Sequence, residues 1–514
     1  MLLWGPEAMK VAVVLRAAFG VTLCAMGFVW ARSTPYHHKT VLLGPAGCGM
    51  ATDIVEPPSG EARGSVLLIH GLAANKKIMA YLAQAFAEAG LRVFVPDLPG
   101  HGRTNEPFSF EHAETCSESL VRELIASGTI NSTRTILAGH SLGGALAIRI
   151  AARLPVAAVI AVSPAPMRAT RGIPAILLPF HTPAVLPAKA LVISAWFEPL
   201  GIREAARDLI TAQSLDSKFL LIPNATHLSV LFDRRVASAA STWAAEALDL
   251  RPPSVLPSLR MLTGSLAGLA GILCLAGLFL RTIFRGPTLC RSASQASSRR
   301  ARASGKLRPL LEVAVASALV ITVLKFWVPL SFVGLFNGDY FASFLLLAGI
   351  VLALLRFGDL RGILGPPLGT LLASGFAGLA LHLAVSGWFD VTLTESWLTA
   401  ARWLRFPVFF VAALPYLLWE ESCLGPTAMP RMPTRLILAL SGRLIAGLWL
   451  MLGIFVLHSG AILLFLLSPY LGVFCLLHRL GMDVVRKHTG SLAATALFGA
   501  ILLAGFCLMF FPVS

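Results

Sequence analysis

Charged residues are scarce in this chain of 514 residues: Asp, Glu, Lys and Arg make up only 13% of it, about half their usual share in soluble proteins. Apolar residues make up 56%, and the mean hydropathy is +0.75. An ordinary soluble protein is therefore excluded. At least part of the chain is predicted to be an integral membrane protein.

Acidic residues are the scarcer sign of charge, 26 against 42 basic residues, which gives a formal net charge of +16. In a soluble protein this excess would suggest nucleic-acid binding. Here eight of the basic residues lie in residues 281–308, a stretch without Asp or Glu. Basic loops beside membrane spans mark the cytoplasmic side. The net charge is therefore interpreted as a topology signal, and no nucleic-acid partner is expected.

The eight cysteines include no CxxC motif and no Cys/His ligand spacing. A disulfide scaffold and a structural zinc site are therefore excluded as devices that organise the fold. Cys48 and Cys116 are the only pair in the polar part of the chain. They could form a disulfide, although two free thiols are the favoured interpretation.

The chain divides by hydropathy into a globular part and a membrane part. Short β-branched runs alternate with amphipathic helical stretches in the globular part, which is typical of the α/β class with a mostly parallel sheet. The first apolar segment is either a signal anchor or a signal peptide. The predicted parts are the anchor or signal peptide 1–31, the globular domain 32–250, the linker 251–258, a transmembrane helix 259–280, a basic cytoplasmic loop 281–308, and a polytopic domain 309–514 with about seven spans.

Loop charges predict the orientation of the spans. Three loops, 331–339, 387–397 and 458–460, contain no Lys or Arg, whereas 420–435 contains Arg431 and Arg435 and 478–490 contains three basic residues. With the N-terminus inside, the uncharged loops and the globular domain lie outside the cytoplasm. The nine predicted spans are 9–31, 259–280, 309–330, 340–356, 366–386, 398–419, 436–457, 461–478 and 491–512.

Ionisable residues inside membrane spans can mark a transport pathway. Most of those in the predicted spans lie near span ends, where snorkelling to the interface explains them. Arg443 and His382 are harder to explain in this way. Gly264 and Gly268 have a spacing compatible with close helix packing, but chance spacing is preferred. The residues assigned to snorkelling are Glu312, Lys325, Arg402, Arg405 and Glu420.

A nucleophile motif lies in residues 135–154, where an apolar run meets Gly-His-Ser-Leu-Gly and continues into an Ala-rich helix. In G-x-S-x-G the serine occupies a sharp strand-to-helix turn, where side chains two residues away would collide. Gly139 and Gly143 remove those side chains. Ser141 is therefore predicted to be a nucleophile; the alternative is a serine that merely caps a helix.

An oxyanion hole needs two backbone N–H groups aimed at the developing negative charge. Leu142 follows the nucleophile and begins the helix, so its N–H is one candidate donor. Residues 66–76 are predicted to contain a strand that ends in His-Gly-Leu. Gly71 permits a tight turn there, and Leu72 offers the second N–H. His70 is expected to be a structural loop residue.

These motifs resemble, in their order, those of the α/β-hydrolase superfamily, in the branch of monoacylglycerol lipases and serine aminopeptidase-like hydrolases. The resemblance covers residues 65 to about 250, less than half of the chain. In this family His101 belongs to a structural loop. The motifs are VLLIHGLAANK (66–76), LRVFVPDLPGHGRT (91–104), GHSLGG (139–144), LVISAWFEPLG (191–201) and IPNATHL (222–228).

The resemblance implies a triad in the order nucleophile, acid, base. His227, after the last apolar strand of the domain, corresponds to the base. Glu198 corresponds to the acid, although the family usually has Asp there, after a glycine that is Ala195 in this chain. Glutamate can fix the imidazole tautomer equally well. Asp208 and Asp233 are less well-placed substitutes.

The connection before residue 190 is too short for a large cap domain. It contains the apolar run GIPAILLPF (172–180), which is predicted to be a lid over the site, with contact to the membrane surface as a further expectation.

Two functions are compatible with this reading of the sequence. The first is a membrane-bound serine hydrolase that cleaves an ester, of a lipid or another acyl compound, with an amide as an alternative, and needs no metal or cofactor. The second is a polytopic transport or lipid-handling protein whose hydrolase-like domain is regulatory. The Ser141, His227 and Leu72 motifs favour the first. The sequence does not indicate an oligomeric state.

Overall fold

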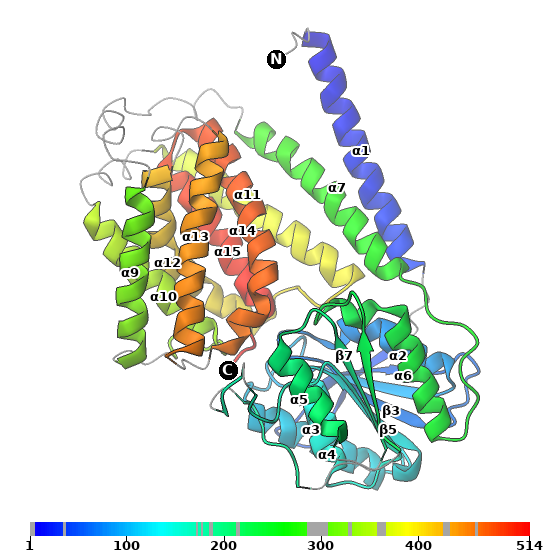
Figure 1. Ribbon diagram of the computed structural model, residues 1–514. Helices are drawn as coiled ribbons and strands as arrows, with labels where there is room; N and C mark the ends of the chain where they lie inside the picture. The colour runs from blue at the N-terminus through cyan, green and yellow to red at the C-terminus, as the bar shows by residue number, and fades with distance from the viewer. Residues whose placement is uncertain are drawn as a thin grey trace. The chain divides into compact units, whose positions relative to one another are not determined.

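The computed structural model describes residues 6–33, 38–170, 173–175, 178–184, 189–211, 216–284, 307–326, 331–356, 366–424, 432–457 and 461–514 (Figure 1). The chain forms two compact units. The helical unit consists of Met1–Met26, Ala267–Trp388 and Trp397–Phe511, and the sheet unit of Gly27–Leu266, Phe389–Ser396 and Pro512–Ser514.

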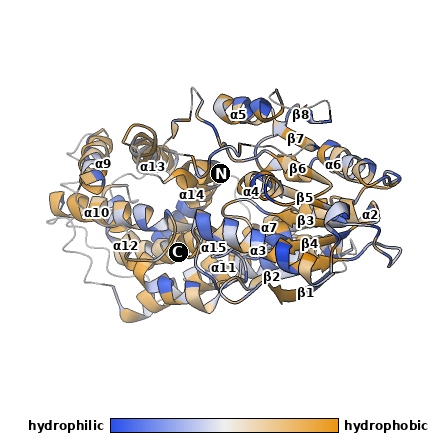
Figure 2. Cartoon of the chain, turned by 90° about the horizontal axis from the view of Figure 1, so that it is seen from below, coloured by the Kyte–Doolittle hydropathy of each residue, from blue (hydrophilic) through white to orange (hydrophobic). Residues whose placement is uncertain are grey.

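The sheet unit is built on one sheet of eight strands in the order β1-β2-β4-β3-β5-β6-β7-β8. β2 is antiparallel to both neighbours, and the pairings from β4 to β8 are parallel. The central strands are apolar on both faces because helices cover both sides of a parallel sheet (Figure 2). The strands are β1 (His38–Leu43), β2 (Met50–Val55), β3 (Ser65–Ile69), β4 (Arg92–Pro96), β5 (Thr135–His140), β6 (Ala158–Val162), β7 (Ala190–Ala195) and β8 (Lys218–Ile222).

Two groups of helices cover the sheet: α2 and α6 on one face, and α3, α4 and α5 on the other (Figures 1 and 2). Alanines at every third or fourth position of α6 let it approach the strands closely. The α/β class predicted from the sequence is confirmed. The helices are α2 (Ala80–Glu88), α3 (Phe110–Ala126), α4 (Leu142–Ala151), α5 (Leu200–Thr211) and α6 (Arg234–Ala247), with 3-10 turns η1 (Lys76–Met79), η2 (Ser132–Arg134) and η4 (Ser229–Phe232).

The strand register brings distant loops to one edge of the sheet. Ile69 at the end of β3 pairs with Gly139 near the end of β5. Ala195 at the end of β7 pairs with Ile222 at the end of β8. Because parallel strands end at the same edge, the loops after β3, β5, β7 and β8 meet there, where ligands of such sheets usually bind.

Nine helices in the described part of the chain are long and apolar enough to cross a membrane, in agreement with the nine predicted spans. Many of their apolar side chains are exposed, Leu404 by 78% and Leu448 by 60%, as expected of faces that contact lipid. The helices are α1 (Pro6–Arg32), α7 (Arg260–Ile283), α9 (Arg308–Phe326), α10 (Gly338–Leu355), α11 (Leu368–Thr392), α12 (Ala400–Leu424), α13 (Met432–Phe455), α14 (Ile462–Thr489) and α15 (Leu492–Phe510).

Helix α14 is longer than its predicted span. The sequence predicted a basic loop at 478–490, but the helix continues to Thr489. The prediction of a loop is wrong because hydropathy alone cannot distinguish a charged loop from a helix whose charges are buried. Arg479 is completely buried, and Arg486 is 7% exposed.

The buried charges of the helical unit neutralise one another. Glu420 accepts hydrogen bonds from Arg443 at 2.9 and 2.8 Å and from Arg479 at 2.9 Å. Arg479 also donates to Glu421 and Asp483, each at 2.5 Å. The expectation that Glu420 snorkels is therefore wrong, since only 1% of it is exposed. An unpaired charge inside a membrane helix is costly, so these ion pairs account for Arg443.

Other residues assigned to snorkelling also have partners inside the unit. Glu312 accepts from Arg356 at 2.8 Å. Arg402 donates to the Leu508 carbonyl at 2.8 Å, and Arg405 donates to the Gly334 carbonyl at 3.0 Å. Snorkelling is therefore wrong for Glu312, Arg402 and Arg405. Lys325, near the end of α9, is exposed, and His382 is 4% exposed beside the Trp403 and Phe406 rings.

Gly264 lies at a close approach between α1 and α7. A Cβ atom there would lie 2.5 Å from the Ala31 nitrogen. Nearby, Trp30 Nε1 donates to Thr263 Oγ1 at 3.0 Å. Gly268 is equally crowded, because its Cβ would collide with the Trp388 ring. The preference for chance spacing is therefore wrong.

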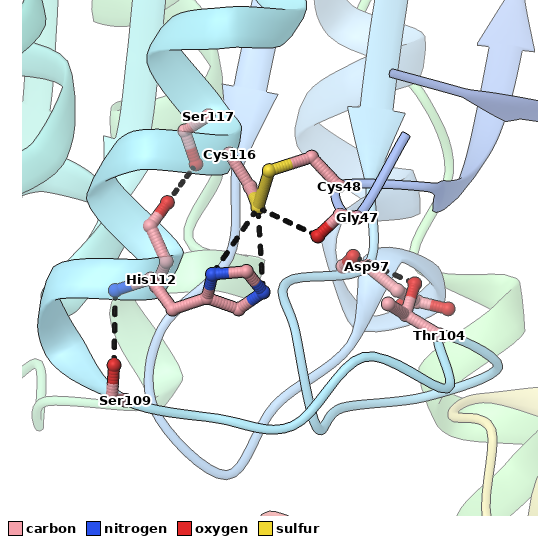
Figure 3. The surroundings of a disulfide bond; sticks show 9 residues. Gly47, Cys48, Asp97, Thr104, Ser109, His112, Cys116 and Ser117 are labelled. Atoms are coloured by element: carbon pink, nitrogen blue, oxygen red, sulfur yellow. Dashed lines mark hydrogen bonds between the residues drawn. A yellow bond between two sulfur atoms is a disulfide. The ribbon is translucent and has the colours of Figure 1, made fainter. Parts of the chain in front are cut away.

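Cys48 and Cys116 form a disulfide in the sheet unit (Figure 3). Cys48 lies in the loop between β1 and β2, and Cys116 lies in α3, one turn after His112, whose ring faces the sulfur. The favoured interpretation as free thiols is wrong, because the fold brings their Cα atoms to 5.0 Å, a distance suited to a bridge. These three residues could otherwise group around a metal, but the two sulfurs are bonded to each other.

Removing this disulfide is expected to destabilise the sheet unit. The bridge closes a loop across 68 positions, and the chain-entropy relation gives about 4 kcal/mol for a loop of that length. In detergent, a reductant should lower the melting temperature of the wild-type protein, whereas the Cys48→Ala/Cys116→Ala variant should melt lower and ignore the reductant. Alkylation of both thiols in unreduced, unfolded protein would contradict the bridge.

Candidate active site

Ser141 occupies the turn between β5 and α4 with a left-handed backbone, φ +53° and ψ −116°. Few residues other than glycine adopt such a conformation unless their surroundings impose it. The Ser141 N–H donates to the Val162 carbonyl at 2.9 Å, and the Ser141 carbonyl accepts from Ala145 and Ala165 at 3.1 and 2.8 Å. Neighbouring β6 and α4 therefore hold the turn in place.

The glycines on either side of Ser141 have no room for a side chain. A Cβ at Gly139 would lie 2.2 Å from the Gly143 carbonyl oxygen, and one at Gly143 would lie 2.1 Å from the Ile69 oxygen. Both distances are far below any contact that a real Cβ makes. The steric reason for G-x-S-x-G in this sequence is therefore present in the structure.

His227, in the loop after β8, joins Ser141 to Glu198. Its Nε2 lies 3.0 Å from Ser141 Oγ, and its Nδ1 lies 2.6 Å from Glu198 Oε1. The His227 side chain is 27% exposed, whereas the Glu198 side chain is fully buried. The structure thus brings together the three residues predicted as a triad, from three separate loops at one edge of the sheet.

Three groups hold the Glu198 carboxylate. Besides His227, its Oε2 accepts from the Ser194 hydroxyl at 2.5 Å and from the Ala195 N–H at 3.1 Å. Burial alone raises the pKa of Glu198, but the hydrogen bond and charge of His227, with the Ser194 hydroxyl, outweigh burial and hold the pKa below its usual value. An ionised Glu198 keeps the proton of His227 on Nδ1, which leaves the Nε2 lone pair for Ser141.

The two substitute acids have other roles. Asp208 pairs with Arg168 at 3.4 Å. Asp233 caps α6, and its hydrogen bonds with Arg235 lower its pKa. Neither carboxylate is bonded to His227 in the described part of the chain.

The predicted oxyanion donors lie beside the nucleophile. Leu142 is the first residue of α4, so its N–H has no acceptor within the helix. On the other side, a Cβ at Gly71 would lie 3.0 Å from Ser141 Cβ and 2.9 Å from His140 Nδ1. Glycine is therefore needed at position 71 because a side chain would collide with His140 and Ser141. The residue with a positive φ in this loop is Ala73, at +63°. The loop thus places Gly71, the residue before Leu72, against Ser141.

Two buried histidines support this loop. His70 Nδ1 donates to the Gly71 carbonyl at 2.8 Å, and its Nε2 accepts from Leu98 at 3.0 Å. His101 accepts from the Ala73 N–H at 3.2 Å. Burial lowers the pKa of His70 to about 4, so its ring is neutral at physiological pH. Both residues have structural positions, as the sequence suggested.

His140 and Ser194 also belong to the site, although neither was predicted from the sequence. His140 Nε2 donates to the His227 carbonyl at 2.8 Å, and burial lowers its pKa to about 3, so a neutral ring supports the backbone of the catalytic candidate. Ser194 anchors Glu198. A signal for each was present: His140 directly precedes the nucleophile, and Ser194 is the one polar residue in the apolar run of β7.

The predicted lid lies partly outside the described residues, since 171–172 and 176–177 are not described. In the described part, Thr170 and Ile173 form a backbone bridge. Phe180 is 7% exposed and packs on Phe110, with ring centroids 5.8 Å apart. The lid function remains a prediction.

The sheet order, the parallel crossovers and the serine on a strand-to-helix turn define the α/β-hydrolase fold, which confirms the predicted fold. Consistent with this, residues 66–274 match a family described as the Alpha/beta hydrolase family. The narrower assignment to the monoacylglycerol lipase branch stays a prediction.

The chain is similar over short stretches to curated proteins. It is 30% identical to Lipase 1 of Psychrobacter immobilis over 90 residues, 18% of this chain and 27% of that lipase. It is 36% identical to Lipase LipV of Mycobacterium tuberculosis over 110 residues, 21% of this chain and 39% of LipV. The chain thus spans between a quarter and two fifths of the length of these two relatives. Among solved structures, a monoacylglycerol lipase of Paleococcus ferrophilus matches 38% of this chain and 99% of its own, at 18% identity and a TM-score of 0.33.

A serine that is hydrogen-bonded to an imidazole, which is itself hydrogen-bonded to a buried carboxylate, can attack a carbonyl carbon.

If Glu198 orients His227, Glu198→Gln should reduce hydrolysis of a p-nitrophenyl ester by about 10²- to 10⁴-fold, because the imidazole loses its partner and its preferred tautomer. Glu198→Asp should keep part of the activity. Asp208→Asn and Asp233→Asn are matched controls that should stay near wild type, and a collapse in either, with active Glu198→Gln, would reassign the acid.

Proposed function

We propose that this protein is a membrane-bound serine hydrolase that cleaves an acyl ester through a covalent acyl-enzyme. The observation that carries the proposal is the continuous hydrogen-bonded chain from Ser141 Oγ to His227 and from His227 to buried Glu198. That arrangement supplies a nucleophile, a general base and the group that orients the base.

In the proposed reaction, Ser141 Oγ attacks the ester carbonyl carbon while His227 Nε2 takes the hydroxyl proton. Collapse of the tetrahedral intermediate releases the alcohol, which receives the proton from His227. A water molecule then attacks the acyl-enzyme while His227 takes its proton, and His227 returns that proton to Ser141 Oγ as the bond to the acyl group breaks and the acid product leaves. Glu198 stabilises the imidazolium in both halves without taking up a proton.

The oxyanion of both intermediates is assigned to the N–H groups of Leu72 and Leu142. The Leu142 N–H lies at the N-terminus of α4, where the helix dipole also favours negative charge. Gly71 brings the Leu72 loop to van der Waals distance of Ser141. Preorganised donors of this kind act mainly on the transition state, so they accelerate chemistry rather than tighten binding.

A lipid acyl ester is the substrate class that the surroundings of the site favour. Trp196, Phe197 and Leu200, which flank Glu198 in sequence, are 51%, 62% and 65% exposed. Large exposed apolar side chains next to the proposed acid suit an acyl chain or a lipid surface. Two proteins of similar sequence, from Psychrobacter immobilis and Mycobacterium tuberculosis, are named as lipases, which agrees with this choice.

The sheet unit is proposed to lie outside the cytoplasm. Two sequence features support that orientation: the loops predicted to be external lack Lys and Arg, and the stretch 281–308 is basic. The bridge between Cys48 and Cys116 supports it, because structural disulfides persist in oxidising compartments. The close approach of α1 and α7 at Gly264 supports a retained signal anchor rather than a cleaved peptide.

The direct test uses membranes that contain the full chain. A fluorophosphonate probe should label the wild-type protein covalently, and Ser141→Ala should abolish labelling and reduce turnover of a p-nitrophenyl ester by about 10⁴-fold or more, because triad members act as a unit. Ser132→Ala is a suitable control, since Ser132 lies in the surface turn η2. Equal labelling of wild type and Ser141→Ala would defeat the proposal.

The orientation can be tested by thiol accessibility in intact cells. In a background that keeps Cys48 and Cys116 and lacks the other six cysteines, Glu61→Cys should react with an impermeant maleimide because Glu61 is exposed on the sheet unit. A cysteine at position 295, in the basic stretch, should react only after permeabilisation. The reverse pattern would place the active site in the cytoplasm.

A further inference from the structure

The segment Phe389–Ser396 belongs to the sheet unit, although its neighbours in sequence belong to the helical unit. It consists of the last turn of α11 and the start of the connection to α12. More than a hundred residues and several spans separate it from the rest of the hydrolase domain along the chain. Its contacts fall on the loop that carries the proposed oxyanion donor Leu72.

Asn75, three residues after Leu72, is bound by this segment at both ends of its side-chain amide. Asn75 Nδ2 donates to Thr394 Oγ1 at 2.8 Å and to the Glu395 carbonyl at 3.2 Å, and Asn75 Oδ1 accepts from the Glu395 N–H at 3.2 Å. Only 5% of Asn75 is exposed. The amide therefore fixes the end of the oxyanion loop against residues 394 and 395.

Lys76 is a buried ammonium shared between two segments of the sheet unit that lie far apart in the sequence. It is 1% exposed, and its Nζ binds Glu395 Oε1 on the segment and Asp97 Oδ2, at 2.8 Å, in the hydrolase domain. Asp97 Oδ1 also accepts from the Lys76 N–H at 2.7 Å. A buried charge is stable only when it is paired, so Lys76 holds its backbone in place only while both carboxylates are near.

Further pairs hold the same segment. Arg103 Nη2 lies 2.9 Å from both carboxylate oxygens of Asp390. Lys77 Nζ donates to the Asp390 carbonyl. Arg103 also lies 3.9 Å from Glu395 through its Nε atom. The contact thus extends to the loop that follows Asp97.

Residues from the C-terminal end of the printed sequence contact that second loop. Val513 donates to the Gly100 carbonyl at 3.0 Å and accepts from the Phe108 N–H at 2.7 Å. This loop carries His101, which accepts from the Ala73 N–H next to Leu72. Two separate segments downstream of the hydrolase domain therefore support the oxyanion loop, one directly and one through the loop that contains His101.

We propose that Phe389–Ser396 is a positioning element of the active site, in which Glu395, through Lys76 and the Asn75 loop, holds the Leu72 N–H where the oxyanion forms. The inference rests on the proposed function, because it uses the assigned role of Leu72. Its consequence is that residues inserted between two predicted spans contribute to catalysis: loss of the contacts that Phe389–Ser396 makes with Asn75 and Lys76 changes the geometry of the oxyanion hole.

Kinetics of the full-length protein in detergent test this role. Glu395→Gln keeps the size of the side chain but removes its charge from Lys76. It should lower kcat for a soluble p-nitrophenyl ester about tenfold while KM changes less than about twofold, because a misplaced oxyanion donor weakens the transition state and not the bound substrate. Glu395→Asp should restore part of kcat. Glu61→Gln, at an exposed position of the same unit, is the matched control.

The pH dependence distinguishes positioning from a merely structural role. Burial, with Asp97 nearby, raises the pKa of Glu395 to about 7, against the opposing effect of Lys76. Protonated Glu395 resembles Gln, so the ratio of wild-type to Glu395→Gln kcat should be near one at about pH 5.5 and reach its full value at about pH 8.5. Any group that titrates alike in both proteins cancels in the ratio. The charged and titratable groups that face or surround Glu395 are Lys76, Lys77, Asp97, Arg103, His70 and Asp390.

A second variant tests the other supporting contact, between Val513 and Gly100, without a change of charge. Val513→Pro removes the N–H that donates to Gly100, and should also lower kcat with little change in KM, whereas Ser514→Pro should not. A ratio of kcat independent of pH, or a Glu395→Gln protein with wild-type kcat, would overturn the proposal. If Ser141→Ala is inactive, those results would refute the role of Glu395 but not the hydrolase function. A wild-type protein that the fluorophosphonate probe does not label would refute the hydrolase function itself.

Discussion

The tight backbone turn at Ser141 is the constraint on which the rest of the site depends. A positive φ at a non-glycine residue persists only when its surroundings impose it, and here β6, the residues just after it and α4 do so through hydrogen bonds to both backbone groups of Ser141. The turn leaves no space for side chains at Gly139 and Gly143. It aims the hydroxyl at the sheet edge where the loops after β7 and β8 place Glu198 and His227.

Much of this site could be predicted from local sequence, because each element has a local cause. The turn needs two glycines at fixed spacing, and the base and acid follow apolar runs that can only be strands of one sheet. The departure of the acid from Asp to Glu is accommodated by Ser194 and the Ala195 N–H, which bind the second carboxylate oxygen. The fold brings Ser141, His227 and Glu198 together, as predicted. Their catalytic roles are proposed.

Contacts between distant segments could not be predicted, because no local pattern encodes them. Cys48 and Cys116 lie 68 positions apart and become neighbours only when α3 folds beside the first hairpin. Lys76 and Glu395 are separated by 319 positions. Charges inside the helical unit were misjudged for the same reason: Glu420 and Arg479 look like residues at the ends of spans until α12 and α14 bring them together.

The most direct measurement of the central claim is the mass of the acyl-enzyme. Full-length protein mixed rapidly with excess p-nitrophenyl butyrate and quenched in acid should carry one butyryl group, located by peptide mapping on the fragment that contains Ser141. Release of p-nitrophenol should show a burst of about one equivalent if deacylation is slower than acylation. An acyl group on a different residue, or turnover of the ester by a Ser141→Ala protein at the wild-type rate, would contradict the account.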